Sequence, residues 1–426
     1  MIDANRPKAI GTLTNRIRTW TNHHTPNACG PIHPHPPPPF LFPIPTIIFV
    51  QTPTMTFSKT LLTGILTTLA CSTLLPSCHL PDKPVSQKEA LDLARRIERS
   101  VEARNDAFLD NIFEQKRFAQ RVLDEAHQRF NFTLAKEAQT AITEAHWGRQ
   151  VIAATRGGGS YTLVHQYEKD GHQHLLFRLF EGSSAINYHD FELVKTDKGV
   201  KALDVYVYMS GEELSKTLAE SLVLMTDKLS DMTPDDQQKI LHIRKINELV
   251  EGGNAEEAGQ YYDQLPGDLK KQKLFQLIHL RIAQKLGDTV YLAALNEYKT
   301  NFPQDPNLGL LMLDAYVMEK DYSSALGAVN RLDTALHTDP FLDYYRSLIF
   351  KLMEDPAQSR FCLEQLHKSM PRFGKGVVEL LANYVHAGYP DSAAMLVHQA
   401  QADSNITADQ IQALETAYPT IQKYLK

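Results

Sequence analysis

Six polar side chains whose chemistry suits catalysis or metal binding fall close together in the chain. They are His165, His172, His174, Tyr188, His189 and Asp190. His172 and His174 are two residues apart, so on a β-strand both imidazoles would point to one face, as zinc ligands can. However, the spacing fixes no third ligand, and His172 follows the turn pair Asp170-Gly171, where a solvated histidine is ordinary. A solvated turn explains the pair without a metal site, which is the lesser alternative, and we predict no metal ion and no cofactor.

A second pair, Tyr188 and Asp190, would also share one face of a strand. A phenol and a carboxylate placed in this way can serve as a proton donor and a base. Any half-exposed sheet offers such pairs by chance, so the pair by itself does not indicate an enzyme. A catalytic pair and an ordinary sheet surface both stay open, and we predict a protein without catalytic residues.

The sequence lacks the motifs of several large enzyme classes. It contains no Gly-x-Ser-x-Gly, no His-Glu-x-x-His and no Cys-x-x-Cys, the signatures of α/β-hydrolases, zinc proteases and thiol redox sites. The glycine run 157–159 has no Gly-Lys-Ser/Thr ending, which a phosphate-binding loop requires. The basic cluster Lys270-Lys271-Gln272-Lys273 follows Pro266-Gly267 at an expected helix start, and a solvated helix face explains it.

The six polar residues belong to four segments with strand-like composition and short, even spacing. These predicted strands are Tyr161–Glu168, His174–Glu181, Ile186–Lys195 and Lys201–Tyr208. Asp170-Gly171 is a favoured hairpin turn, and Asp197-Lys198-Gly199 joins the last two strands in the same way. The four strands therefore form an antiparallel meander.

Helices are expected on both sides of this meander. Apolar residues recur every three or four positions over 90–101, from Ala107 to Phe130, and more loosely over 134–154. After the last strand, Ser210 and Glu213 have the spacing of a capping box, which predicts that a helix starts there. Helices plus a four-stranded antiparallel meander make an α+β domain over residues 78–220.

The first helices of this domain carry a family resemblance. The pattern Ile97-x3-Val101, followed by Asn105-Asp106-Ala107-Phe108-Leu109 and Ile112-Phe113, is similar to the opening of the nuclear transport factor 2-like (cystatin-like) family. The resemblance implies a cone-shaped domain. In some family members, such as ketosteroid isomerases, the cone holds a catalytic site, and in many others it has no such role.

A targeting signal precedes this domain. Lys59 supplies a positive charge after Met55, residues 61–75 form an apolar core, and Leu75-Pro76-Ser77-Cys78 ends it. This ending resembles the lipobox of bacterial lipoproteins, which implies a signal peptide over 55–77 and a lipid on Cys78. A plain signal peptide, an uncleaved anchor and a competing site at Cys71 are the alternatives.

The residues before Met55 differ from the rest of the chain. The segment 1–54 holds 11 of the 23 prolines and one acidic residue, and it lacks a periodic apolar pattern. We expect a disordered leader, which a start codon placed too early would also explain. The whole chain carries 44 basic and 50 acidic residues, a balance that argues against a nucleic-acid-binding protein. Four cysteines are too few for a disulfide-stapled scaffold.

The last half of the chain is helical and repeats with a period of about 34 residues. One apolar column consists of Ile282, Tyr316, Phe350 and Tyr384, and a second of Leu295, Val329, Leu363 and Val397. Small residues recur at Ala325, Ser359 and Ala393. Each unit fits two antiparallel helices in which the large residue of the first helix packs against the small residue and the aliphatics of the second.

This pattern closely resembles the tetratricopeptide repeat in the length of its unit, in a Tyr nine residues before a helical Ala, and in Pro at the unit's end. The resemblance predicts an all-α helical-hairpin solenoid over 221–426, with about five repeats from roughly 236 to 405 and a capping helix from Thr407 to Lys426. It implies a concave groove that binds extended peptides or partner helices. Cys362 falls in one of these helices and is expected to be buried.

Together these patterns predict a non-enzymatic scaffold. We expect a lipid-anchored protein of the bacterial cell envelope, in the outer membrane and facing the periplasm, that binds partner proteins through its repeat groove and no nucleic acid. The alternative is a small-molecule or enzymatic site in the cone, with the repeats recruiting partners. A cone filled by Phe and Leu would favour the scaffold, and a buried Asp or His facing an open cavity would favour the alternative.

Overall fold

The computed structural model describes residues 83–126, 136, 138–140, 143, 146–156, 158–182, 185–225 and 234–402, and all of them belong to one compact unit, Pro39–Lys426. The proposed lipid site Cys78, the signal segment 55–77 and the expected capping helix 407–426 lie outside the described residues. Among the helices of the described part, none is both long and apolar enough to cross a membrane.

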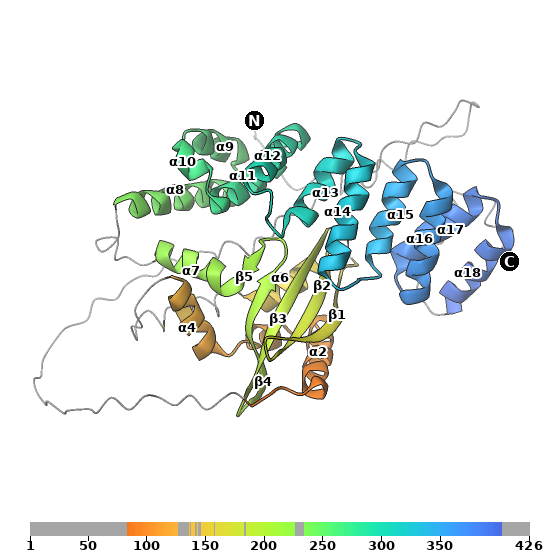
Figure 1. Ribbon diagram of the computed structural model, residues 1–426, viewed down its shortest axis with the longest axis horizontal. Coiled ribbons are helices and arrows are strands. Elements are labelled where there is room, and N and C mark those ends of the chain that lie inside the picture. Colours follow the sequence, from red (N-terminus) through yellow and green to blue (C-terminus); the bar gives the residue numbers. More distant parts are fainter. Residues whose placement is uncertain are drawn as a thin grey trace, which may run out of the picture. The chain divides into compact units, whose positions relative to one another are not determined.

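An antiparallel five-stranded sheet follows the first helices (Figure 1), in the order β1-β2-β3-β4-β5. Its strands are β1 (Ser160–Lys169), β2 (His172–Phe180), β3 (Ile186–Thr196), β4 (Gly199–Val207) and β5 (Glu212–Glu213). The first four match the predicted meander, and Asp170 and Gly171 form the predicted turn with positive φ angles of 52° and 80°. The α+β prediction for this part is confirmed, with β5 as an unexpected fifth strand.

The predicted helix start at Ser210 is wrong. The side chain of Ser210 donates to the carbonyl of Val207 and caps no helix, and helix α7 (Leu214–Met225) begins after β5. The first turn of α7 is capped from the sheet instead, because Asp204 on β4 accepts a hydrogen bond from the Ser215 N–H at 3.2 Å. A carboxylate from a distant strand thus replaces the local capping box.

The helices before the sheet are α2 (Gln87–Glu102), α3 (Asp106–Asp110), α4 (Gln115–Glu125) and α6 (Trp147–Ala154). The single helix expected from Ala107 to Phe130 is interrupted between α3 and α4. Here the backbone pairs with the sheet, since the Ala202 N–H donates to the Ile112 carbonyl and the Glu114 N–H donates to the Ala202 carbonyl. Pairing with a strand satisfies backbone groups that a continuous helix would have satisfied internally.

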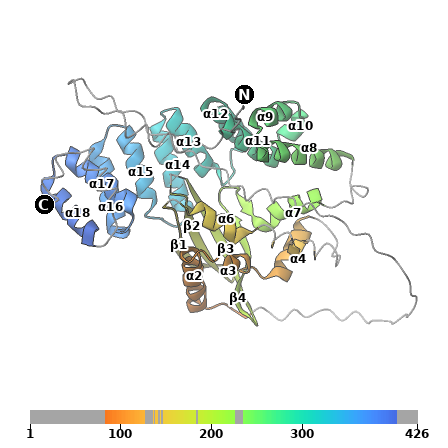
Figure 2. The same cartoon turned by 180° about the vertical axis from the view of Figure 1, so that it is seen from behind.

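Aromatic side chains fill the space between these helices and the sheet. Figure 2 shows α2, α3 and α6 on this side of the strands. Phe113 lies 5.1 Å from Phe118 and 6.3 Å from Trp147, and Trp147 lies 6.3 Å from Phe191 on β3. The ring of Phe177 on β2 lies 5.9 Å from that of Phe191. The interior of the α+β domain is therefore packed with large rings, all of them buried.

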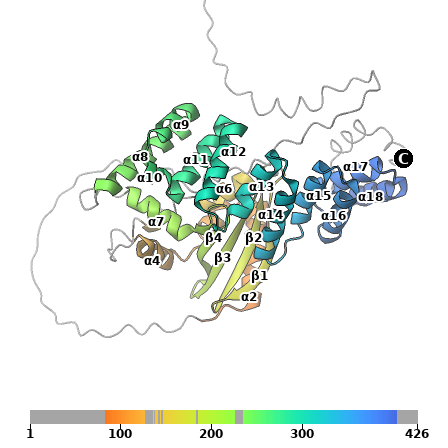
Figure 3. The same ribbon diagram turned by 45° about the horizontal axis from the view of Figure 1, so that its top comes forward.

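The rest of the described chain is helical. Its helices are α8 (Pro234–Glu251), α9 (Ala255–Asp263), α10 (Gly267–Lys270), α11 (Lys273–Leu286), α12 (Asp288–Asn301), α13 (Leu308–Met318), α14 (Tyr322–Ala335), α15 (Leu342–Leu352), α16 (Pro356–Ser369), α17 (Gly374–His386) and α18 (Pro390–Ala402). They pack mainly against helices close to them in the chain, so the contacts run in sequence order (Figure 3).

The helices after α7 pair in a regular way. The second members α12, α14, α16 and α18 begin at Asp288, Tyr322, Pro356 and Pro390, which are evenly spaced at the period of the sequence repeat. A residue with positive φ stands one or two positions before each start: Gly287, Lys320, Glu354 and Gly388. Gly253 stands in the same relation to α9. Such residues end a helix and turn the chain into the next one, which sets the hairpin connections.

Candidate functional site

The sheet has two chemically different faces, because side chains alternate along each strand. One face packs on α2, α3 and α6 through the aromatic core. The other carries polar side chains in one band across neighbouring strands, including Arg178, Tyr188, Asp190 and Glu192, whose β2–β3 partners in register are Tyr188↔Arg178, Asp190↔Leu176 and Glu192↔His174. Five of the six polar residues singled out in the sequence lie on this polar face or beside it. His189 is the exception.

One end of the polar face docks onto the helical part through a buried ion pair. The guanidinium of Arg178 donates from Nη1 to both carboxylate oxygens of Asp339, at 2.6 and 2.8 Å. These side chains are 3% and 1% exposed. Tyr188 donates its hydroxyl to the same carboxylate at 2.8 Å, and burial raises the pKa of Tyr188 well above its usual value. Tyr188 therefore holds an interface together, and it does not form the site with Asp190 that the sequence suggested.

Aromatic rings surround this ion pair. Arg178 lies over the ring of Phe341 at 4.3 Å, and Phe341 is 5.0 Å from Phe180 on β2. Phe373 contacts both Phe180 and Phe341, at 5.6 and 4.9 Å. The ε-ammonium of Lys375 lies 5.6 Å from the Phe180 ring. Because the rings exclude water from the guanidinium, its charge depends on Asp339 for compensation.

The loop that brings Asp339 to the sheet is strained. His337 and Thr338 have φ angles of 57° and 77°, which are unfavourable for residues with a side chain and most of all for a β-branched one. His165 on β1 donates to the Thr338 carbonyl at 2.6 Å, and Asp339 accepts from the N–H of Phe341. Contacts with the sheet thus hold a backbone conformation that costs about 1–3 kcal/mol per residue.

The helical residues that contact the sheet recur with the repeat. Asn307, Phe341 and Lys375 occupy one phase of successive units, and Asp305, Asp339 and Phe373 occupy another; we call these six residues the docking strip. Asn307 donates to the Met209 carbonyl at 3.3 Å, and a side chain at Gly211 would meet Asp305 at 2.7 Å. The sheet and its β4–β5 turn therefore contact equivalent positions in three successive helix pairs, at the connection from one pair to the next.

Farther along the polar face, Asp190 is the centre of a second cluster. It accepts hydrogen bonds from the hydroxyl of Tyr167 and, at 3.2 Å, from Nδ1 of His174. The rings of Tyr167 and His174 stack at 5.1 Å, and His337 of the strained loop lies 5.7 Å from Tyr167. An Asp–His pair of this kind can position an imidazole for proton transfer. In this protein Tyr167, His174 and Asp190 join the strands β1, β2 and β3 to the loop that carries His337.

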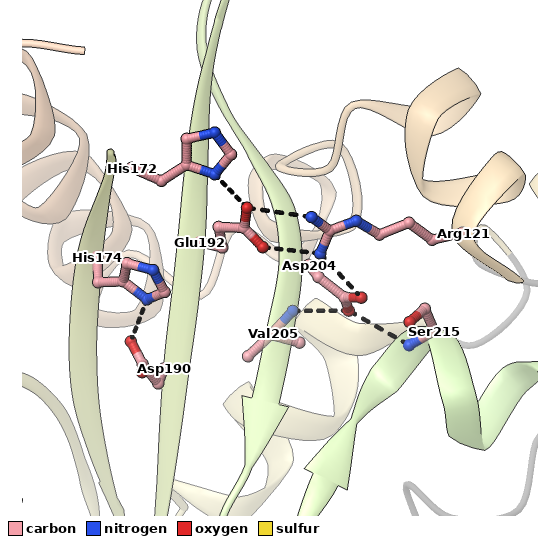
Figure 4. A network of polar contacts seen from close by, with 8 residues as sticks. All are labelled: Arg121, His172, His174, Asp190, Glu192, Asp204, Val205 and Ser215. Carbon is pink, nitrogen blue, oxygen red and sulfur yellow. Dashed lines mark hydrogen bonds and ion pairs between the residues drawn. The ribbon is translucent and has the colours of Figure 1, made fainter. Parts of the chain in front are cut away.

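The third cluster joins the sheet to α4 and α7 (Figure 4). Glu192 accepts from His172 and from both terminal nitrogens of Arg121, at 2.7 and 3.0 Å. Arg121 also lies 3.6 Å from the carboxylate of Asp204, which accepts from the backbone N–H groups of Val205 and Ser215. These contacts link α4, β2, β3, β4 and α7 in one network.

The two carboxylates of this network titrate differently. Burial raises the pKa of Asp204 to about 6, although its hydrogen bonds and the charge of Arg121 oppose the shift. Burial acts in the same direction on Glu192, but the hydrogen bonds and charge of Arg121, with help from His172, hold the pKa of Glu192 below its usual value. Neighbouring carboxyl groups whose pKa values are shifted in opposite directions occur in active sites, and they also occur in structural ion networks.

His172 and His174 do point to one face, as the spacing predicted, but each binds its own carboxylate, Glu192 or Asp190. Within the residues that the structure describes, no group of three or more His, Cys, Asp or Glu side chains is placed to hold a metal ion.

His189 points into the aromatic interior and is fully buried. Asn187 accepts from two backbone N–H groups, which fixes its amide so that it donates to Nε2 of His189 at 3.3 Å. Nδ1 therefore carries the proton and donates to the Tyr161 oxygen at 2.9 Å. Burial lowers the pKa of His189 to about 3, so the ring is neutral. With Trp147 against it at 4.7 Å, this histidine is a satisfied core residue.

The residues predicted to pack the repeats lie in the expected helices. Ile282, Ala325 and Ala393 are fully buried, at 0%, 0% and 1% exposure. The large residues of the later units, Tyr316, Phe350 and Tyr384, are half-buried. Cys362 is buried in α16, as expected.

Comparisons with known proteins add no identity, since no family model, no curated protein and no solved structure matches this chain. The resemblances to tetratricopeptide and nuclear transport factor 2-like proteins stay predictions from the sequence. Sequence reasoning missed Arg178, Asp339, Arg121, Glu192 and Asp204. The one signal available was the repeat phase that Asp339 shares with Asp305.

Proposed function

We propose that this chain is a non-enzymatic scaffold whose helices form a tetratricopeptide-like array that binds partner proteins. The observation that carries the proposal is the coincidence of two periods. The apolar columns of the sequence recur at one fixed interval, and four successive second helices begin at that same interval. Arrays built in this way expose extended surfaces and are widely used to bind peptides and helices.

The α+β domain supports this role better than it supports catalysis. Large rings fill its interior, and the buried His189 has protein partners on both ring nitrogens. The polar face commits Arg178 and Tyr188 to the docked loop, and the clusters around Asp190 and Glu192 join structural elements. The alternative, a small-molecule or enzymatic cone with recruiting repeats, has no comparable observation in its favour.

In this proposal the sheet braces the array. Its contacts with the docking strip take up one edge of three helix pairs and leave the outer faces of the second helices available. Two large apolar side chains one repeat unit apart, Phe361 on α16 and Met395 on α18, are 56% and 60% exposed there. Their counterpart one unit earlier is Gly327, so the apolar surface belongs to the last two pairs. Single exposed apolar side chains are common on protein surfaces, so it is the recurrence of these two at one repeat position that makes them the residues to test for a partner contact.

We further propose that a lipid on Cys78 anchors the protein in the bacterial cell envelope, in the outer membrane and facing the periplasm. The lipobox-like ending at Cys78 and the apolar run before it support this proposal. Replacement of Cys78 by Ala should move the protein from the membrane fraction to the soluble fraction when both are separated after cell lysis. Unchanged membrane association of the variant would contradict a lipid on this residue.

A pull-down tests the scaffold itself. Tagged protein is recovered from a detergent-solubilised envelope, alongside a variant carrying Phe361→Glu and Met395→Glu. We expect a stoichiometric partner protein with the unaltered chain and a weakened interaction with the variant. Recovery of no stable partner with the unaltered chain would refute the scaffold function, whereas equal recovery with both would move the contact to another face of the array.

A further inference from the structure

The docking strip has an uncovered counterpart one unit earlier. Lys271 and Lys273 stand one repeat unit before Asp305 and Asn307 and continue the same two columns. Lys273 pairs with Asp305 at 2.9 Å, at the margin of the sheet contact. The side chain of Lys271 is exposed and makes no ion pair or hydrogen bond with the residues that the structure describes. The position that holds the chain's own sheet in three later units is thus open in this one.

At this position the surface has a shallow, open hollow. A hollow of about 540 Å³ lies between α10 and the end of α12, lined by Gly267, Lys270, Lys271, Asn296, Glu297, Thr300 and Asn301. Lys270 donates to the Asp263 carbonyl at 3.0 Å, which orients its ammonium group without neutralising it. Two ammonium groups therefore border the hollow. Glu297 is its acidic member, with His279 at 3.7 Å and the Gln276 amide at 3.4 Å.

Buried polar atoms next to Glu297 have no hydrogen-bond partner. Gln276 is 2% exposed, and its Oε1 is unpaired. Tyr262 is also 2% exposed, stacks on His279 at 4.3 Å, and has an unpaired hydroxyl. Unpaired buried groups of this kind cost about 1–3 kcal/mol each and are uncommon in native proteins. Neither Gln276 nor Tyr262 is among the residues that line the hollow, so a ligand there would contact Lys270, Lys271 and Glu297 and not these buried atoms.

Lys271 stands in the same column of the repeat as Asp305 and Asp339, and its charge indicates what kind of group it would bind. Where the chain binds its own sheet, Asp339 accepts the cationic Arg178. The column carries the opposite charge at Lys271, so the matching group on a partner is a carboxylate. Resting on the scaffold function proposed above, we infer that the surface formed by Lys270, Lys271 and the hollow beside them binds an acidic, extended segment of a partner protein.

Binding of a model peptide tests this inference. Fluorescein-labelled octaglutamate is titrated with the full-length chain carrying Cys78→Ser, in mild detergent and 50 mM salt, and fluorescence anisotropy is followed; octaglutamine is the uncharged control. We expect octaglutamate to bind and octaglutamine to bind at least tenfold more weakly. The double variant Lys270→Glu/Lys271→Glu should lower the affinity for octaglutamate by about tenfold or more, and Lys270→Gln/Lys271→Gln should give an intermediate affinity.

The matched control is Lys285→Glu/Lys368→Glu, which makes the same charge change on exposed residues outside the hollow. It should bind octaglutamate like the unaltered protein. Equal binding of the two peptides, no binding of octaglutamate, or equal loss in both charge-reversed variants would overturn the inference. The envelope pull-down separates this failure from failure of the scaffold. A partner recovered equally with Lys270→Glu/Lys271→Glu leaves the scaffold intact and removes the site.

Discussion

The buried ion pair between the sheet and the helical part allows a quantitative prediction. Asp339→Asn keeps the size of the side chain and an oxygen that can accept from Tyr188, but it removes the charge that compensates Arg178. Both partners are almost fully buried, at 3% and 1% exposure, and the pair is bidentate. Breaking a buried pair by neutralising one partner costs about 3–5 kcal/mol, because the other charge stays buried and uncompensated.

Urea denaturation followed by circular dichroism measures this cost. We expect the free energy of unfolding of Asp339→Asn to fall by about 3–5 kcal/mol. A triple variant, Arg178→Met/Tyr188→Phe/Asp339→Leu, removes the three side-chain polar groups together and should recover much of the loss, since a packed apolar set replaces the pair. The recovery stays incomplete because the buried Phe341 N–H loses its acceptor. Its recovery would separate the cost of an unpaired charge from a general disturbance of the fold.

A loss below about 1 kcal/mol for Asp339→Asn would refute the reasoning, because that is the range of solvent-exposed pairs. It would mean that water reaches Arg178 and that the docked loop leaves the sheet in solution. A loss in the triple variant as large as in Asp339→Asn would equally contradict the assignment, since shape rather than charge would then hold the interface.

Three further predictions concern single residues. Lys320 and Glu354 have φ angles near 59° and 58° at a position where the other units carry Gly. Replacing either residue by Gly should therefore raise the free energy of unfolding by up to about 1 kcal/mol in urea titrations. A lower free energy of unfolding would show that contacts of these side chains outweigh the backbone strain. His189 has a pKa of about 3 when folded, below its unfolded value near 6.5, so stability should fall as pH drops below 6.5, by about 2 kcal/mol at pH 5. His189→Gln should lose this part of the pH dependence, and an unchanged slope would contradict a neutral buried ring. Asp204 has the opposite sign, since its folded pKa of about 6 exceeds its unfolded value, so its ionisation costs stability as pH rises from about 4 to 7. Asp204→Asn should therefore gain most relative to the unaltered protein at pH 8, by up to about 3 kcal/mol in thermal or urea unfolding, and no gain would place Asp204 in contact with water.

Local patterns predicted much of the fold. Strand-like composition and the Asp170-Gly171 turn predicted the four long strands, and the repeating apolar columns predicted the spacing at which the second helices after α11 begin. Two errors came from contacts between distant segments. The break between α3 and α4 depends on pairing with Ala202, and the start of α7 depends on Asp204, and neither contact has a local signature.

The candidate site was harder to predict for the same reason. His172, His174 and Asp190 were recognised as polar residues on one face, but what each binds depends on the register between strands. Arg178 and Asp339 are separated by 161 residues. The two residues can pair only when both the sheet and the helical part are folded. A single sequence does not show which distant residues will pair, and the repeat phase of Asp339 was the only signal.

The docking strip has a mechanical consequence. An array in which each helix pair packs mainly on its neighbours behaves as a spring, because small rotations between pairs add up along its length. The sheet and the turn after β4 contact three successive helix pairs within the docking strip, through Asn307 in the first, Asp339 in the second and Phe373 in the third, and these contacts restrain rotation between the pairs. The helices at the two ends, α8–α9 and α18, lie outside the docking strip and can rotate more easily against their neighbours. If the proposed lipid anchor and partner pulled on the chain from opposite ends, the helices outside the docking strip would separate first and the pairs held by the sheet last.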